Sequence, residues 1–173
     1  RVGKLWIGPP WEPVPQGVEA IVVDPGRAFG TGGHATTRLC LQLLDAVARG
    51  SLLDVGCGSG VLAIAGARLG FAPVLAVDHD PAALEATRRN AAANGVELDV
   101  READALSEPL PAVDTAVANI SAESVRLVLP RLDTGTVVAS GYLERDVPAA
   151  DGFRHERRVT EGGWAADLFR REE

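Results

Sequence analysis

The sequence has few of the residues that build disulfide frameworks and metal sites. It contains two cysteines, Cys40 and Cys57, and three histidines in 173 residues. Cys40 falls in an expected helix and Cys57 in a glycine-rich loop, with no paired spacing that suggests a disulfide framework or a zinc site. The histidines His34, His79 and His155 are scattered and lack a carboxylate-rich ligand spacing, so we expect no metal.

Long apolar runs and a surplus of basic residues are missing as well. No apolar run approaches the ~20 residues that cross a bilayer, so we expect no membrane partner. With 17 Lys and Arg against 24 Asp and Glu, the net charge is -7, whereas nucleic-acid-binding domains usually carry a basic stripe. A cationic ligand or a basic protein partner fits this charge better than nucleic acid does.

The N-terminus lacks the charged-then-apolar pattern of a secretory signal, which favours a cytoplasmic protein. The sequence also has no methionine, and we therefore expect Arg1 to be a trimmed or processed start. A length of 173 residues is usual for one domain. We expect a monomer.

The pattern of apolar residues predicts an α/β protein. Residues 1–17 hold two tryptophans and four prolines, a composition typical of an extended arm or linker packed on a domain surface. Residues 18–173 are expected to form one domain, because short apolar runs alternate there with amphipathic helices, as in βαβ units. Strands are expected at 18–23, 51–55, 74–77, 96–100, 113–118 and 136–140, and helices at 34–49, 61–69, 81–94 and 121–129.

The end of the sequence predicts a different arrangement. Residues 153–159 and 164–169 flank Glu161-Gly162-Gly163, which indicates an antiparallel hairpin. The stretch 143–152 before it looks too short for a crossover helix. Together with the five central strands, the hairpin gives a doubly wound, mostly parallel seven-stranded sheet.

The strongest local motif is Asp54-Val55-Gly56-Cys57-Gly58-Ser59-Gly60, where a strand is expected to pass into a helix. Glycines at such a turn let the backbone approach a ligand, and the helix N-terminus offers free amide donors. The spacing is G-x-G-x-G with an acidic residue two places ahead, whereas dinucleotide enzymes favour G-x-G-x-x-G. A nicotinamide oxidoreductase is therefore disfavoured.

Two aspartates follow at the ends of the next two expected strands. Asp78 comes 22 residues after Gly56, where a carboxylate can accept both hydroxyls of an adenosine ribose. Asp104 is placed to bond the amino group of an adenine. The alternative is that each aspartate only starts a turn. The loop and both aspartates at consecutive strand ends indicate an adenosine-containing ligand.

The sequence resembles one family over nearly its whole length. The matching motifs are the Trp and Pro residues of the arm, Asp24-Pro25-Gly26, Ala28-Phe29-Gly30-Thr31-Gly32, His34, Thr36-Thr37, the glycine loop, Asp78-His79-Asp80-Pro81, Ala118-Asn119-Ile120, Ser140-Gly141 and the Trp164 hairpin. This set is similar to the methyltransferases that modify the eleventh protein of the large ribosomal subunit. The segment from Asp24 to Thr37 is its most specific part.

The resemblance implies a Rossmann-like class I methyltransferase fold for residues 18–173, with S-adenosyl-L-methionine as the cofactor. The acceptor would be a protein amine, either a lysine side chain or an N-terminal α-amine. We expect a basic protein substrate, the eleventh large-subunit ribosomal protein.

The resemblance also implies roles for individual residues. The residues expected to bind the cofactor are Phe29, Gly30, Thr31, Gly32, Thr37, Asp54, Gly56, Gly58, Gly60, Asp78, His79, Asp104, Ala105 and Asn119. Phe29 and the backbone of 30–32 would form a lid over the methionine end, and Phe29 and His34 would wall the substrate channel. Asn119 would position the acceptor amine. The plainer alternatives are that His34 bonds its own helix turn and that Asn119 only forms a turn at a strand end.

The acceptor is open to alternatives. The family carries an additional N-terminal domain that recognises the ribosomal protein, and we expect none of it within these residues. Either Arg1 is a truncation point or the chain selects another substrate. N-methylation of another protein or of a small molecule is therefore one alternative, and a non-catalytic module that binds S-adenosylmethionine is the other.

Overall fold

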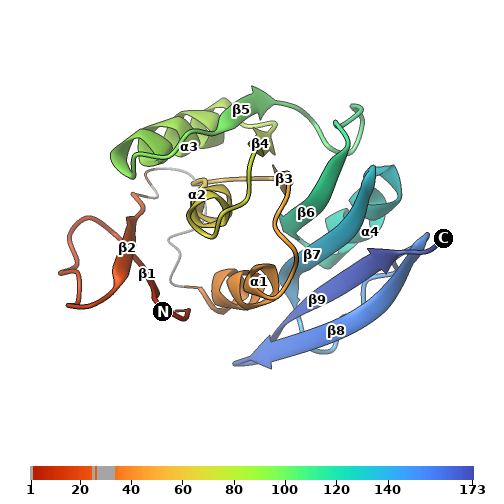
Figure 1. Ribbon diagram of the computed structural model, residues 1–173. Coiled ribbons are helices and arrows are strands. Elements are labelled where there is room, and N and C mark those ends of the chain that lie inside the picture. Colours follow the sequence, from red (N-terminus) through yellow and green to blue (C-terminus); the bar gives the residue numbers. More distant parts are fainter. Residues whose placement is uncertain (1, 25, 27–33) are drawn as a thin grey trace.

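The computed structural model describes residues 2–24, 26 and 34–173. Its centre is a seven-stranded sheet with the order β5-β4-β3-β6-β7-β9-β8 (Figure 1). The strands are β3 (Leu52–Val55), β4 (Val74–Asp78), β5 (Asp99–Glu102), β6 (Val113–Asn119), β7 (Thr134–Leu143), β8 (Phe153–Glu161) and β9 (Trp164–Arg171). The strands from β5 to β7 pair in parallel, while β9 runs antiparallel to both β7 and β8. The predicted doubly wound sheet with a C-terminal hairpin is confirmed.

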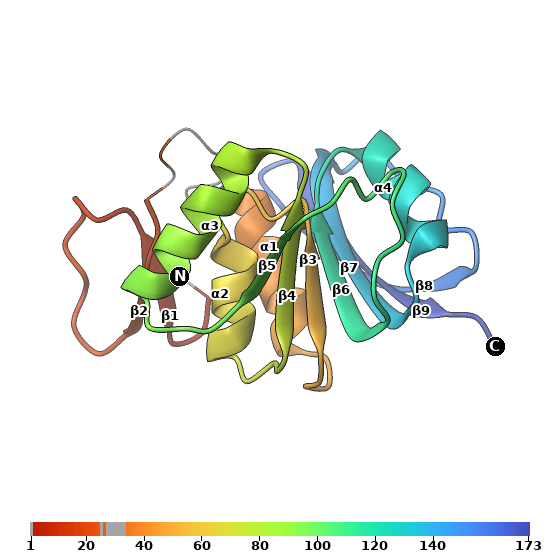
Figure 2. The same cartoon turned by 90° about the horizontal axis from the view of Figure 1, so that it is seen from above.

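Helices cover both faces of this sheet. The helices α1 (Ala35–Asp45), α2 (Val61–Arg68) and α3 (Pro81–Ala93) lie on one face (Figure 2). On the other face lies α4 (Ala122–Val128), which continues into a 3-10 turn at Leu129–Arg131. Successive side chains of a strand point to opposite faces, so Leu52 packs in the core beneath α1 and α2 while Leu53 packs in the core beneath α4. This explains why the central strands read as continuous apolar runs.

The N-terminal arm contains a strand that the sequence analysis did not predict. β1 (Leu5–Gly8) pairs in parallel with β2 (Glu19–Val22), and together they form a small separate sheet. Leu5, Ile21 and Val23 are buried in the same core as α1 and α2. The strand expected at 18–23 is therefore present, but it lies outside the main sheet, beside α3 (Figure 2). The division of the chain at residue 17 stays a prediction.

Several element boundaries differ from prediction, and two of the differences have identifiable reasons. α1 ends at Asp45 instead of residue 49, because the Arg49 guanidinium turns back and donates to the carbonyls of Leu44 and Val47 at 2.9 and 2.6 Å. Such bonds satisfy carbonyls that have no partner within the helix. The third central strand starts at Asp99 instead of residue 96, because the preceding extended residues pack on the core before sheet pairing begins.

Candidate active site

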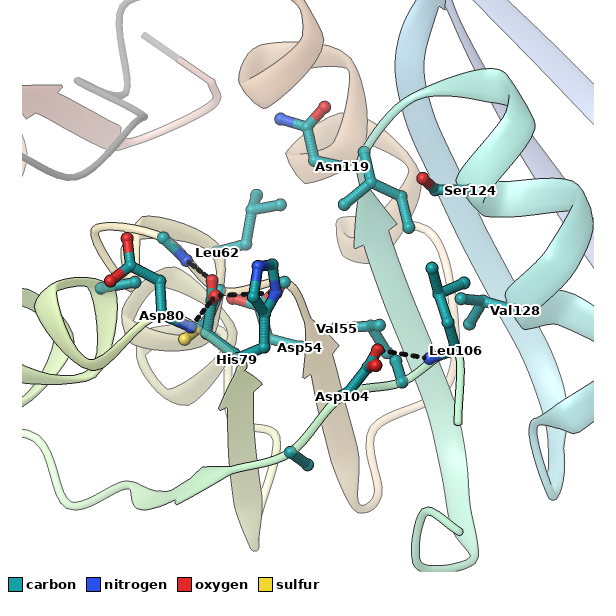
Figure 3. A pocket seen from close by; sticks show the side chains of 18 of the residues that line it. Asp54, Val55, Leu62, His79, Asp80, Asp104, Leu106, Asn119, Ser124 and Val128 are labelled. Atoms are coloured by element: carbon teal, nitrogen blue, oxygen red, sulfur yellow. Dashed lines mark hydrogen bonds and ion pairs between the residues drawn. The ribbon is translucent and has the colours of Figure 1, made fainter. Parts of the chain in front are cut away.

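A cavity of about 650 Å³ opens at the carboxyl ends of the central parallel strands. This is the place where open α/β sheets bind their ligands, and the volume lies within the range of small-molecule sites. In Figure 3, His79 and Asp80 lie on one side of the cavity, Leu106 and Val128 on the opposite side, and Asn119 above them.

The glycine loop that follows β3 forms the floor of the cavity. Gly56, Gly58 and Gly60 have φ values of +70°, +56° and +83°, a left-handed conformation that other residues rarely adopt. Gly60 is the N-cap of α2 and has no side chain that could accept a hydrogen bond from the helix. The buried Asp54 takes this role and accepts a hydrogen bond from Ala63 N at 3.0 Å. The acidic residue before the loop therefore supports the start of α2.

Asp78 lies at the end of β4 with only 11% of its side chain exposed. Its Oδ2 accepts a hydrogen bond from Gly58 N and its Oδ1 accepts one from Asp80 N, both at 3.0 Å. His79 Nδ1 lies 3.7 Å from Oδ1. A carboxylate has about four acceptor sites, so Asp78 can hold the glycine loop and still accept hydroxyls from a ligand.

Asp104 forms the turn after β5 and also lines the cavity. It accepts hydrogen bonds from Leu106 N at 3.0 Å and from Ser107 Oγ at 2.9 Å, and these bonds lower the pKa of its carboxyl. Asp78 and Asp104 thus do form turns, as the plainer alternative expected. They also meet at one cavity, as the ligand hypothesis requires.

A chain of hydrogen bonds orients Asn119 at the end of β6. Asn119 Nδ2 donates to Thr36 Oγ1 at 3.2 Å, and Thr36 Oγ1 lies 2.8 Å from His34 Nδ1. His34 Nδ1 also accepts from Thr36 N at 3.3 Å and caps α1, so this nitrogen is an acceptor and the threonine hydroxyl is its donor. The planar amide of Asn119 consequently has its oxygen turned away from Thr36.

The tip of the C-terminal hairpin packs on the start of α1. The rings of His34 and Trp164 meet edge to face with centroids 4.7 Å apart. One turn further along α1, Arg38 donates to both carboxylate oxygens of Glu161, with a shortest distance of 2.8 Å. The hairpin therefore fixes the helix end that carries Thr36 and His34.

Burial changes the acidity of two groups at the glycine loop. It raises the pKa of Asp54 to about 7, although the bond from Ala63 N acts in the opposite direction. Burial and the nearby Asp54 raise the pKa of Cys57 to about 12. A thiol with that pKa is protonated at neutral pH, so Cys57 does not supply a thiolate nucleophile.

Nine of the residues expected at the cofactor line the cavity. They are Thr37, Asp54, Gly56, Gly58, Asp78, His79, Asp104, Ala105 and Asn119. Gly60 and His34 do not line the cavity themselves. The hydrogen bonds of His34 are those of the plainer alternative, in which it bonds its own helix turn. Phe29, Gly30, Thr31 and Gly32 lie outside the described residues. Roles for all of these residues stay predictions.

The apolar wall of the cavity was missed from the sequence. It includes Leu62, Leu106, Ile120 and Val128. Leu106 follows the predicted Ala105 and Ile120 follows the predicted Asn119, so both could have been inferred as neighbours of site residues. Val128 comes from α4, whose place over the cavity depends on the fold and on no motif.

The described part of the chain shows no metal centre: nowhere in residues 2–24, 26 and 34–173 do three His, Cys, Asp or Glu side chains group to hold an ion. Over the same residues, none of the helices has the length and apolar character needed to span a bilayer.

Comparison with known proteins decides the family. The sequence model of the ribosomal protein L11 methyltransferase (PrmA) family matches residues 1–172. The chain belongs to this family. A ribosomal protein L11 methyltransferase from Pelobacter propionicus is 43% identical over 99% of the chain. The chain spans 62% of that relative and 59% of another from Laribacter hongkongensis, to which it is 45% identical over 94% of its length.

One solved structure agrees with this membership of the L11 methyltransferase family, and a second shares the fold. A ribosomal protein L11 methylase from Lactobacillus delbrueckii subsp. bulgaricus superposes with a TM-score of 0.85 at 32% identity, over 98% of this chain and 96% of that one. A tRNA (uracil-54, C5)-methyltransferase from Pyrococcus abyssi, solved with S-adenosyl-L-homocysteine, superposes with a TM-score of 0.63 at 21% identity, over 82% and 39% of the two chains. The second likeness concerns the fold alone.

Proposed function

We propose that this chain transfers methyl groups from S-adenosyl-L-methionine to amines of ribosomal protein L11. Membership of the L11 methyltransferase family supports the reaction and the substrate. The observation that carries the proposal is the cavity itself, where the glycine loop and Asp78 meet the oriented amide of Asn119. The net charge of -7 suits a basic ribosomal protein.

The residues of the cavity fit the cofactor. The left-handed glycines allow the tight turn of residues 56–60 that brings the backbone of Gly56 and Gly58 to the cavity. Asp78 would accept the ribose hydroxyls, and Asp104 with the apolar Leu106 and Ile120 would hold the adenine. The bound cofactor supplies an activated methyl group on a sulfonium, so the chain needs no strong acid or base.

The chain's task is then to position a neutral amine. A lysine amine with its ordinary pKa of ~10.4 must give up a proton at a cost of roughly 4–5 kcal/mol at pH 7, and an apolar channel lowers that cost because it disfavours the charged form. Asn119 Oδ1 can accept an amine hydrogen and direct the nitrogen lone pair toward the methyl group. Such positioning accounts for large rate effects in enzymes.

Cofactor binding tests the first half of the proposal. Calorimetry with S-adenosyl-L-homocysteine should give a micromolar dissociation constant, and Asp78→Ala should weaken it roughly 30-fold or more, because two charge-assisted hydrogen bonds are lost. Asp99→Ala is the matched control, since Asp99 is an exposed strand aspartate paired with Arg101. Equal affinity of wild type and Asp78→Ala would remove the cofactor assignment.

Methyl transfer tests the second half. The chain is incubated with recombinant ribosomal protein L11 and methyl-labelled cofactor, and label in the protein is counted. We expect Asn119→Ala to lower the turnover number roughly 100-fold, because the acceptor amine is then no longer oriented toward the methyl group. Cofactor binding without transfer of label to ribosomal protein L11 would contradict the assignment of this substrate to the chain.

A further inference from the structure

Helix α3 and its C-cap residue carry three buried polar side chains on the face that the helix turns toward the core. Thr87, Asn90 and Asn94 are 0%, 2% and 8% exposed. Their spacing of three and four residues places them in one row along the helix. We call this row the α3 polar stripe. Buried polar groups are costly unless they are hydrogen-bonded, so the partners of the stripe indicate what it is for.

On one side, the stripe binds the backbone of the N-terminal arm. Asn94 accepts from Val22 N at 2.9 Å and donates to Val22 O at 2.7 Å. Asn90 accepts from Asp24 N at 3.0 Å and donates to Asp24 O at 2.8 Å. Each amide thus satisfies both backbone groups of one residue, as a neighbouring strand would, and fixes residues 22–24 on α3.

On the other side, the stripe binds the glycine loop from behind the cavity. Thr87 Oγ1 donates to Gly58 O at 3.0 Å, and Asn90 Nδ2 donates to Ser59 O at 2.9 Å. In a trans peptide, the carbonyl and the following N–H point in opposite directions. Holding these two carbonyls toward α3 therefore fixes the peptide groups 58–59 and 59–60, which directly follow the lining residues Gly56, Cys57 and Gly58. The N–H of the second peptide donates to Cys57 O at 2.8 Å and closes the loop.

Asn90 is the member of the stripe that joins both sides. Its single amide contacts Asp24 and Ser59, whereas the remaining bond of Asn94 goes to Asn90 O within its own helix. We propose that Asn90 is a positioning residue of the cofactor site, which holds the glycine loop in its ligand-binding shape and makes that shape depend on the docking of residues 22–24. The identity of the ligand in this inference rests on the proposed function.

The structure provides a matched pair of variants to test this role. Asn90→Leu and Asn94→Leu are similar in volume change, lie on one face of one helix and each release the arm, but the first alone releases the glycine loop. We expect both to lower the urea midpoint. Affinity for S-adenosyl-L-homocysteine should fall about tenfold in Asn90→Leu, as expected for a lost buried hydrogen bond, and less than about threefold in Asn94→Leu. Equal losses of affinity in the two variants would overturn the proposal.

Hydrogen exchange gives a readout that needs no ligand. In Asn90→Leu, amides of residues 56–62 should exchange faster than in Asn94→Leu at matched stability, which a general loss of packing would not produce. If either leucine variant does not fold, Asn90→Ser and Asn94→Ser replace the pair. If the wild-type chain binds no S-adenosyl-L-homocysteine, the proposed function fails, and the exchange comparison alone then decides whether Asn90 positions the loop.

Discussion

The buried carboxyl of Asp54 should make the stability of this protein fall with rising pH. Asp54 is 1% exposed and accepts one backbone hydrogen bond, from Ala63 N. Burial, with a further contribution from the charge of Asp78, raises its pKa from 3.8 to about 7. The unfolded chain therefore ionises at this position well before the folded protein does, and the difference is a term in stability.

The direction and size of this effect follow from the two pKa values. The contribution is fully present below pH 3.8 and is lost as the pH rises to about 7. Each pH unit in which only the unfolded state is ionised costs about 1.4 kcal/mol. Between pH 5.5 and pH 8.5, Asp54 should therefore lower the free energy of unfolding by about 2 kcal/mol.

The substitution Asp54→Asn isolates the term, because asparagine has nearly the shape of a neutral aspartic acid and keeps an oxygen for Ala63 N. Urea unfolding of both proteins is measured at pH 5.5, 6.5, 7.5 and 8.5. We expect the difference in free energy of unfolding to shift in favour of the variant by about 2 kcal/mol across this range. Parallel pH profiles of the two proteins would show that Asp54 does not titrate as the structure indicates.

Two further substitutions probe the sheet. Gly141 has a φ of +105°, and a Cβ there would overlap the carbonyl oxygen of Ile120, which lines the cavity beside Asn119. Gly141→Ala should therefore displace this cavity wall, abolish methyl transfer and cost more stability than Gly163→Ala. Gly163 is left-handed with open space around it, so strain alone costs about 1–2 kcal/mol there. Asp167 is buried, which by itself would raise its pKa, but hydrogen bonds led by two from Arg158 lower it overall. Arg158→Met should cost roughly 3–5 kcal/mol in urea unfolding, because it leaves a buried carboxylate short of partners, and a cost below about 1 kcal/mol would contradict this.

The order of the central elements was predictable from the sequence because local signals set it. Apolar runs of strand length alternate with amphipathic segments, and the N-cap Asp80, with Pro81 after it, marks the start of α3. β1 could not be predicted, because four prolines follow it closely and β2, the strand it pairs with, is more than ten residues away. Composition rejects a helix there, but it does not reveal a pairing between distant residues.

The candidate site also has parts that the sequence predicted and parts that it could not predict. The glycine loop, Asp78 and Asn119 could be predicted as site residues because each lies at the end of an apolar run that predicts a strand. The orientation of Asn119 by Thr36 could not, since the two residues are 83 positions apart. The contacts of Asn90 and Asn94 were also hidden: both residues fall in the helix expected at 81–94, and only the packed structure shows their bonds to the arm and the glycine loop.

The place of β9 has a consequence for biosynthesis. This strand inserts between β7 and β8, and the tip of its hairpin holds the start of α1 through Arg38 and Glu161, which are 123 positions apart. Chains fold progressively as they leave the ribosome, and residues 35–140 can assemble most of the parallel sheet early. The contact between Trp164 and His34 must wait until residues 153–171 have been translated, so the start of α1 gains its support only when the C-terminal hairpin is complete.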